Sequence, residues 1–315
     1  MNFINTSVVT VHERFFFREA FSYFLIFTAL LLVVCWIQFL HPIAYVYLIS
    51  EDNIGEYSTS VAFAVAACFF FAVARRSAGL NRLFMFFMTF LNILIAGEEI
   101  SWGQRIFGVD TPELLRNINQ QGEITLHNIG SLQGASFHEV AGVFLQILMV
   151  ISVLKNRLSQ SFDSIRSLSL PPVSLWPAAV VVSYVLVAMP MVKGDEIAEA
   201  LLAFLVLIWS ILITRELRAQ VVSERDRIVA VVCILAATIS TGAVLSTVFG
   251  KNMGWRYNIT ASRDYPNSGM MEQSRILFEH ILNRTDLIQP DTLESYRNIH
   301  GALPRSGGPV SVLVH

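Results

Sequence analysis

Seven stretches of predominantly apolar residues run through the chain, and their length restricts it to a membrane fold. They cover residues 21–41, 57–75, 82–102, 137–155, 174–193, 195–214 and 228–249. A hydrocarbon core about 30 Å thick is crossed by roughly 20 helical residues, so each stretch is long enough to span it. Backbone groups in lipid must pair inside the protein, which favours helices. The sequence therefore predicts an all-α, polytopic membrane helical bundle of about seven transmembrane helices.

Composition supports this prediction and excludes several classes of partner. Hydrophobic residues make up 54% of the 315 and charged residues only 15%, whereas soluble domains carry about 25% charged residues. The net charge of −2 and the absence of a basic block argue against nucleic acid. No P-loop or dinucleotide fingerprint is present, so no nucleotide is expected. The expected partners are membrane lipids and, in one interpretation, other membrane-protein subunits.

The distribution of cations predicts an orientation. With a cytoplasmic N-terminus, twelve Lys and Arg residues near the span ends face the cytoplasm, and the opposite loops hold only Arg105, Arg116 and Lys193. Cytoplasmic loops are enriched in Lys and Arg, so we expect the N-terminus inside and the C-terminus outside. Residues 1–249 then form the bundle, with an extracytoplasmic loop at 97–136. Residues 250–315 form a short extracytoplasmic C-terminal tail with an amphipathic helix at Met270–Arg284 and a short helix at Leu293–Ile299.

Three predicted spans place an acid and a cation at the same separation. The pairs Arg82–Glu98, Glu139–Lys155 and Glu199–Arg215 are each sixteen residues apart, which is roughly 24 Å along a helix. Three carboxylates from three helices therefore reach a similar depth at the extracytoplasmic side. Charged span ends set by bilayer thickness would give the same spacing. Acids within membrane spans are nevertheless candidates for function.

Most of the polar residues that suggest chemistry lie between Gly97 and Asn128. The predicted catalytic residues are Glu98, Glu99, Arg105, His127 and, from the sixth span, Glu199. If the third helix continues far enough, Glu98, Trp102 and Arg105 share one face at spacing i, i+4, i+7. The structural alternative is that Glu99 pairs with Arg105 or with an adjacent helix, while Trp102 anchors the membrane interface. Substrate contacts are predicted for Trp102, Gln104, Asn128, Glu139 and Glu196.

A divalent metal ion is one cofactor that these residue types would suit. The predicted ligands are Glu98, His127, His138 and Glu199. Carboxylates with one or two imidazoles suit zinc, iron, manganese or calcium. No HExxH, HxxxH or Cys framework is present, and acid–base work by a carboxylate pair without metal is equally compatible with the sequence. At the start of the sixth span, Asp195 is expected to cap the helix.

The motifs GEEISWGQR, TPE, QGE and LHN between Gly97 and Asn128 resemble the signature of a group of uncharacterised multi-pass membrane proteins of bacteria. The resemblance covers about thirty residues and implies a bacterial inner-membrane setting without implying an activity. Seven-span hydrolases of the alkaline ceramidase type carry paired histidines in their last span. Residues 228–249 contain no His, which argues against that family.

These observations favour an intramembrane enzyme, a hydrolase or transferase that acts on a lipid or a lipid-linked substrate at the extracytoplasmic face. The alternative is a non-catalytic subunit or assembly factor of a larger membrane complex, with the loop and the tail as docking surface. A transporter ranks third, because no acid or base lies near the middle of any predicted span, where transport sites are usually built.

Overall fold

Helices form every regular element of the computed structural model, which describes residues 6–113, 124–125, 137–161, 167–188, 191–217, 223–250, 254–284 and 286–301. Within these ranges five segments are long and apolar enough to cross a membrane. They are Phe17–Leu40, Pro42–Ala74, Gly79–Glu99, Gly194–Arg215 and Arg225–Phe249. The prediction of an all-helical, membrane-type protein is confirmed at this level.

The predicted spans at 137–155 and 174–193 correspond to shorter apolar helices. Gly142–Lys155 belongs to α7 (Phe137–Ser161), and Val173–Val185 covers η3 (Val173–Leu175) and most of α9 (Trp176–Ala188). The two helices are joined by the Gln146 side chain, which donates to Ser183 Oγ at 2.6 Å. The described helices therefore support five spans by length and composition, with two shorter apolar helices beside them.

The helix that contains the first predicted span ends where proline predicts a break. Helix α1 (Thr6–Leu40) ends one residue before His41, and α2 (Pro42–Ile49) starts at the proline. Proline lacks the N–H that would continue the helix but fits a first helical turn. A short turn then leads into α3 (Ile54–Ala74). The chain therefore breaks its helix at His41-Pro42.

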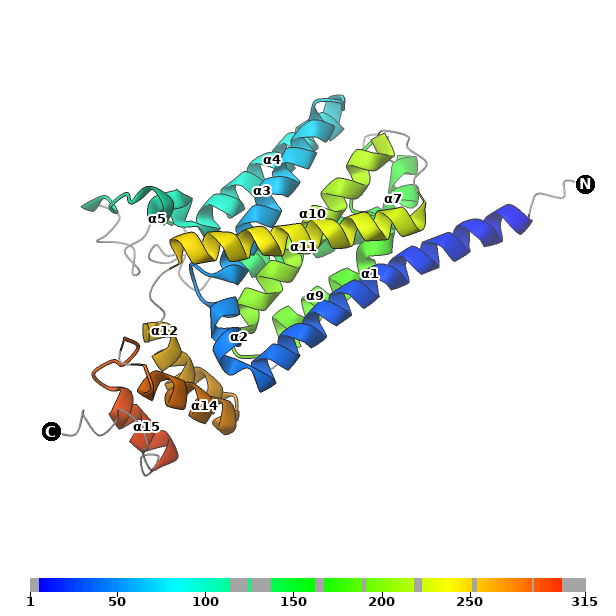
Figure 1. Cartoon of the computed structure of the whole chain (residues 1–315). Coiled ribbons are helices and arrows are strands. Elements are labelled where there is room, and N and C mark those ends of the chain that lie inside the picture. Colours follow the sequence, from blue (N-terminus) through cyan, green and yellow to red (C-terminus); the bar gives the residue numbers. More distant parts are fainter. Residues whose placement is uncertain are drawn as a thin grey trace, which may run out of the picture.

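Helix α3 packs against three neighbours, α4 (Gly79–Glu99), α10 (Gly194–Leu217) and α11 (Glu224–Phe249) (Figure 1). Small side chains allow these close approaches. A Cβ built on Gly242 of α11 would overlap Ser58 Oγ of α3. On the other side of α3, Ser60 Oγ donates to the Ala96 carbonyl of α4 at 2.8 Å.

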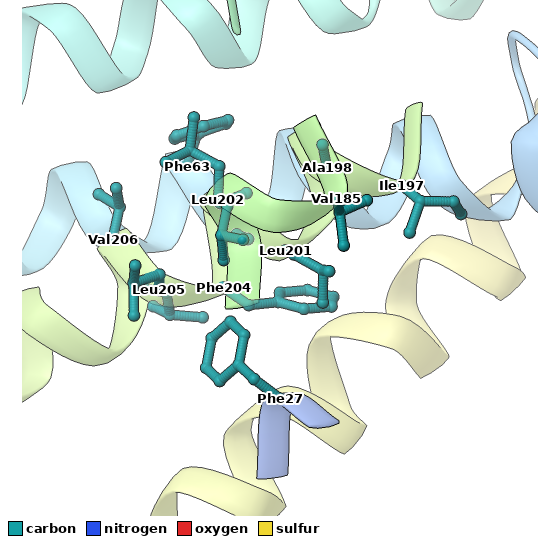
Figure 2. Close-up of a cluster of buried hydrophobic side chains, with 14 of the residues drawn as sticks. Phe27, Phe63, Val185, Ile197, Ala198, Leu201, Leu202, Phe204, Leu205 and Val206 are labelled. Carbon is teal, nitrogen blue, oxygen red and sulfur yellow. The ribbon is translucent and has the colours of Figure 1, made fainter. Parts of the chain in front are cut away.

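Helix α10 is the most enclosed element, because residues 201–214 are all buried. Apolar side chains from several helices surround it. Figure 2 shows Phe63 of α3 against Leu202 of α10, with Phe27 of α1 near Phe204. Further along, Trp209 meets the ring of Phe70 edge-on, with 4.9 Å between centroids. A helix that is apolar on all sides is expected in such a position.

The outer helices expose apolar side chains in the way that a lipid-facing surface does. Leu32 of α1, Phe90 of α4 and Val244 of α11 are each at least 60% exposed. Contiguous exposed apolar surface on this scale marks a membrane or a protein interface. These faces fit the hydrocarbon core of a bilayer.

The C-terminal helices form a small group beside α2, at one end of the bundle (Figure 1). They are α12 (Gly254–Ile259), the π-helical η4 (Thr260–Asp264), α13 (Tyr265–Asn267), α14 (Met271–Leu282) and α15 (Thr292–His300). Helices α14 and α15 occupy nearly the two ranges predicted from the sequence. Leu277, Phe278 and Tyr296 of these helices are buried.

The tail is fastened to the end of α1, where helical carbonyls have no partner within the helix. Tyr265 Oη donates to the Gln38 carbonyl at 3.2 Å, and the Gln273 amide donates to the Phe39 carbonyl at 3.1 Å. Because α1 stops at Leu40, these two carbonyls belong to its last turn. The tail therefore caps the first helix of the bundle.

A substitution at Gly242 tests the close approach of α11 to α3. We expect Gly242→Val to lower the free energy of unfolding in detergent by about 1–3 kcal/mol, because the added side chain overlaps Ser58. Thermal unfolding of the purified protein measures the change. Ala236→Val, on an exposed position of the same helix, is the matched control and should leave the melting temperature nearly unchanged.

The tail should loosen in acid because two of its histidines are held in their neutral form. Burial lowers the pKa of His280 and His300, and Arg284 and Arg275 lower these pKa values further, against smaller opposite effects of Asp286 and Glu272. A lowered pKa in the folded state means that the unfolded tail binds protons first as the pH falls. The stabilising contribution is therefore complete above about pH 6.5 and is lost below it.

Hydrogen–deuterium exchange of residues 254–301 tests this prediction. After correction for intrinsic exchange rates, the protection of these backbone amides should decrease as the pH is lowered from about 7.5 to about 5.5. The double variant His280→Gln, His300→Gln should remove this dependence. The introduced amide at position 300 keeps a donor for Ser274 Oγ, which lies 3.0 Å from the His300 ring in the native protein. A pH dependence that survives in the double variant would contradict the assignment.

Candidate functional site

Six carboxylates gather where α3 and α10 begin and α4 ends, and we call them the carboxylate cluster. Its members come from the turn before α3, from α3, from α4 and from α10: Glu51, Glu56, Glu98, Glu99, Glu196 and Glu199. Glu56 interacts electrostatically with Glu99, Glu196, Glu51 and Glu199. Glu99 does so with Glu199, Glu196 and Glu98. The structure therefore brings together Glu98, Glu99, Glu196 and Glu199, which the sequence had selected.

Glu56 belongs to this cluster but was missed in the sequence. Asn53 precedes the first helical residue of α3, and Glu56 is the third residue of that helix. A carboxylate at this position commonly binds a free N–H group at the helix start. The Glu56 side chain accepts a hydrogen bond from the backbone N–H of Asp52. The sequence feature that could have identified Glu56 is its position directly before the predicted span 57–75, three residues after the potential capping residue Asn53.

The end of α4 differs from the prediction. The sequence predicted a helix through residue 102, with Glu98, Trp102 and Arg105 on one face. The helix ends at Glu99, and Ser101, Trp102 and Gly103 have left-handed φ values of 48°, 54° and 72°. A left-handed turn of three residues reverses the chain, so the i, i+4, i+7 relation no longer describes these side chains.

Trp102 folds back onto the end of α4 and binds Glu98. Its indole Nε1 donates to Glu98 Oε1 at 2.7 Å, and Glu98 is only 8% exposed. The ring lies against Gly97, where an added Cβ would meet it at 2.9 Å. Glycine at position 97 is therefore required for the ring to reach the carboxylate. Trp102 acts first as a partner of Glu98, although 46% of its surface stays accessible.

Gln104 holds the loop that follows α5 (Gln104–Phe107). Its amide nitrogen donates to Thr111 Oγ1 at 2.6 Å, and its amide oxygen accepts from the Ile124 backbone N–H at 2.9 Å. Thr111 is buried. Both ends of the Gln104 amide are therefore used inside the chain, which gives this predicted substrate contact a positioning role.

Two cations lie near the cluster among the residues that the structure describes. Arg256 of α12 forms an ion pair with Glu51, and Lys193 interacts electrostatically with Glu196. The Arg256–Glu51 pair joins the tail to the edge of the cluster. Asp195, expected to cap α10, lies exposed in its first turn, where the helix dipole favours acids.

Several predicted residues lie outside what the structure describes. His127 and Asn128 fall outside the described residues. Arg105 lies in α5, and His138 and Glu139 lie in the first turn of α7, but only their backbone is described. Across the described ranges, no group of three or more His, Cys, Asp or Glu is placed to hold a metal ion. The metal ligand set of Glu98, His127, His138 and Glu199 stays a prediction.

Comparison of the chain with protein-family models, with curated proteins and with solved structures finds no match. The site is therefore interpreted from its own residues. The site consists mainly of carboxylates from three helices. One of these carboxylates, Glu98, accepts a hydrogen bond from the Trp102 indole. Carboxylates in such numbers can transfer protons or bind a cationic or hydroxyl-rich group.

A double-mutant cycle tests the contact between Trp102 and the end of α4. Trp102→Phe should lower the free energy of unfolding by about 1–3 kcal/mol, because the enclosed Glu98 carboxylate loses one donor. Gly97→Ala should have a similar effect, since the methyl group displaces the ring. The double variant should be little worse than either single variant, because both changes remove the same contact. Fully additive losses in thermal unfolding would show that the two residues act independently.

Proposed function

We propose that this protein is an intramembrane enzyme, a hydrolase or transferase, that acts on a lipid or a lipid-linked substrate. The observation that carries the proposal is the meeting of Glu56, Glu99, Glu196 and Glu199 from three helices at one end of the bundle. Three helices each place at least one acid at this end of the bundle, where like charges repel one another. Groups of this kind at membrane depth are usually retained for function.

The proposed chemistry is general acid–base catalysis by the pair Glu99 and Glu199. Two adjacent carboxylates can divide the work, with one donating a proton to a leaving group while the other accepts a proton from water or a substrate hydroxyl. These two side chains interact with each other from α4 and α10. Glu98, bound by Trp102, would position the end of α4.

Access from the bilayer favours a lipid over a water-soluble substrate. Helix α4, which carries Glu98 and Glu99, exposes the large apolar side chains Phe90 and Ile93 on its outer face. A lipid lying beside α4 would reach the cluster with its head group while its chains remain in hydrocarbon. The proposal also includes the seven-span topology with the cluster on the extracytoplasmic side of a bacterial inner membrane.

Lipid conversion by the purified protein tests this function. The protein is placed in vesicles of bacterial polar lipids, and lipid species are compared by mass spectrometry before and after incubation. We expect new products with the native protein and a loss of at least about 100-fold in their rate for Glu99→Gln and Glu199→Gln, which is typical when a general acid or base is removed. Thermal unfolding of each variant checks that the fold is retained.

Glu294→Gln, an exposed acid of α15 outside the cluster, is the control and should leave the rate unchanged. Unchanged product formation in Glu99→Gln and Glu199→Gln would contradict the catalytic assignment. A folded native protein that forms no product would instead favour the role of a non-catalytic subunit.

A further inference from the structure

The segment that follows α4 exposes large apolar side chains next to the carboxylate cluster. Phe107 is 76% exposed, more than any other large apolar side chain in the described part of the chain. Val109 is 51% exposed and Trp102 is 46% exposed. We call these three residues the apolar patch. Apolar side chains of this size that gather at a protein surface mark a contact with a membrane or with another protein.

Polar contacts hold this segment in place and leave the patch facing outward. The Gln104 amide binds Thr111 and the Ile124 backbone, and Thr111 is 5% exposed. The Val109 backbone N–H donates to the Gln104 carbonyl at 2.9 Å. Gln104 and Thr111 are therefore used inside the segment, while Phe107 and Val109 are exposed. This is the reverse of the arrangement expected in a loop that is surrounded by water.

The patch continues the exposed apolar face of α4. Leu83, Phe87 and Phe90 are exposed and share one face of this helix at spacing i, i+4, i+7. Gly97, seven residues after Phe90, lies on the same face. The Trp102 ring covers this position, because a Cβ added to Gly97 would meet the ring at 2.9 Å. The apolar surface of the membrane-spanning helix therefore continues over Trp102.

A second glycine lets the surface continue beyond Trp102. A Cβ added to Gly103 would meet the Phe107 ring at 2.9 Å, so the ring lies over this position. Gly103 also has a left-handed φ of 72°, which helps to turn the chain at the end of α4. Figure 1 shows α5, which carries Phe107, beside the end of α4 and apart from the tail helices α12, α14 and α15. The apolar surface therefore extends beyond α4 and away from the tail.

The length of α4 places its end at the boundary of the hydrocarbon core. The helix has 21 residues, which is roughly 31 Å along its axis, and the core is about 30 Å thick. Trp102 therefore lies at the level where indole rings are enriched in membrane proteins. Its Nε1 donates to Glu98 while much of its ring stays accessible, which suits a boundary that is polar on one side and apolar on the other. A bilayer thus fits the patch by depth as well as by chemistry.

We propose that the apolar patch inserts into the boundary between the head groups and the acyl chains of a phospholipid bilayer, in the leaflet that borders the carboxylate cluster. Residues 101–111 then form an element that lies in the membrane surface. Burial of apolar area drives insertion of this kind, so a zwitterionic lipid is sufficient. Because Trp102 binds Glu98, the same insertion fixes the level of Glu98 at the membrane boundary. Insertion requires no catalytic activity of the cluster.

Depth measurements with spin labels on the full chain test the proposal. Single cysteines are introduced as Phe107→Cys and Val109→Cys in a protein whose three native cysteines are replaced by alanine. Each variant receives a nitroxide label and is placed in vesicles of phosphatidylcholine. Collisions of the label with oxygen, which concentrates in hydrocarbon, and with a water-soluble nickel chelate report its depth. Phe90→Cys, on the exposed face of α4, and Glu294→Cys, on the exposed side of α15, are the lipid and water controls.

We expect the labels at positions 107 and 109 to lie about 5–10 Å into the boundary region, the depth typical of elements that lie in the membrane surface. Their ratio of oxygen to nickel collisions should fall between the ratios at positions 90 and 294. Ratios equal to that at position 294 would overturn the proposal, because the patch would then face water. Poor access of both reagents would overturn it as well, since another protein would then cover the patch, as a non-catalytic subunit requires.

Fluorescence quenching by brominated phosphatidylcholine gives a second measurement in which the patch keeps its native side chains. Bromines near the head-group end of the acyl chains should quench a smaller fraction of the emission in Trp102→Phe than in the native protein, because the variant lacks the indole at the boundary. Trp209→Phe removes an indole that is 1% exposed inside the bundle, so this matched control should raise the quenched fraction. An unchanged quenched fraction in Trp102→Phe would contradict the insertion of Trp102.

Discussion

The close approach of α3 to three neighbouring helices is the constraint on which the rest of the structure depends. Gly242 lets α11 lie against Ser58, and the Ser60 hydroxyl binds the backbone of α4. Helix α10 also packs against α3. The first turn of α3 therefore lies close to the end of α4 and to the start of α10. Small residues allow such close packing of helices in membranes. Lipid provides no hydrophobic driving force for helix association, so the stabilisation depends on how closely the helices approach. The carboxylate cluster follows from this arrangement.

The carboxylate cluster borders the apolar interior of the bundle on two of its own helices. Glu99 and Glu199 lie at the end, and Leu202 and Asn92 continue from them along the same two helices. The enclosed α10 contributes to both parts, because Glu199 lies in its second turn and Trp209 lies beyond its middle. A single helix therefore connects the proposed chemistry to the buried core.

The C-terminal tail packs beside α1 and α2 at the end of the bundle where the carboxylate cluster lies. Tyr265 and Gln273 bind the last carbonyls of α1, and Arg256 pairs with Glu51 of the cluster. These contacts link residues more than 200 positions apart in the sequence. They make the tail part of the architecture around the site, and the lowered pKa values of His280 and His300 predict that this part is sensitive to acid.

The sequence by itself determined the helical membrane character, the break at Pro42 and the selection of Glu98, Glu99, Glu196 and Glu199, because apolar length, proline and acids at span ends each act locally. The sequence prediction continued α4 too far, because the contact of Trp102 with Gly97 depends on how the chain folds back on itself. It also missed Glu56, because this residue joins the cluster only when α3 packs beside α10. Only the tertiary structure decided which acids meet, that Gln104 is used inside the loop and that the Trp102 ring covers Gly97. Helix periodicity tells which way a side chain points, but only helix association determines what it meets.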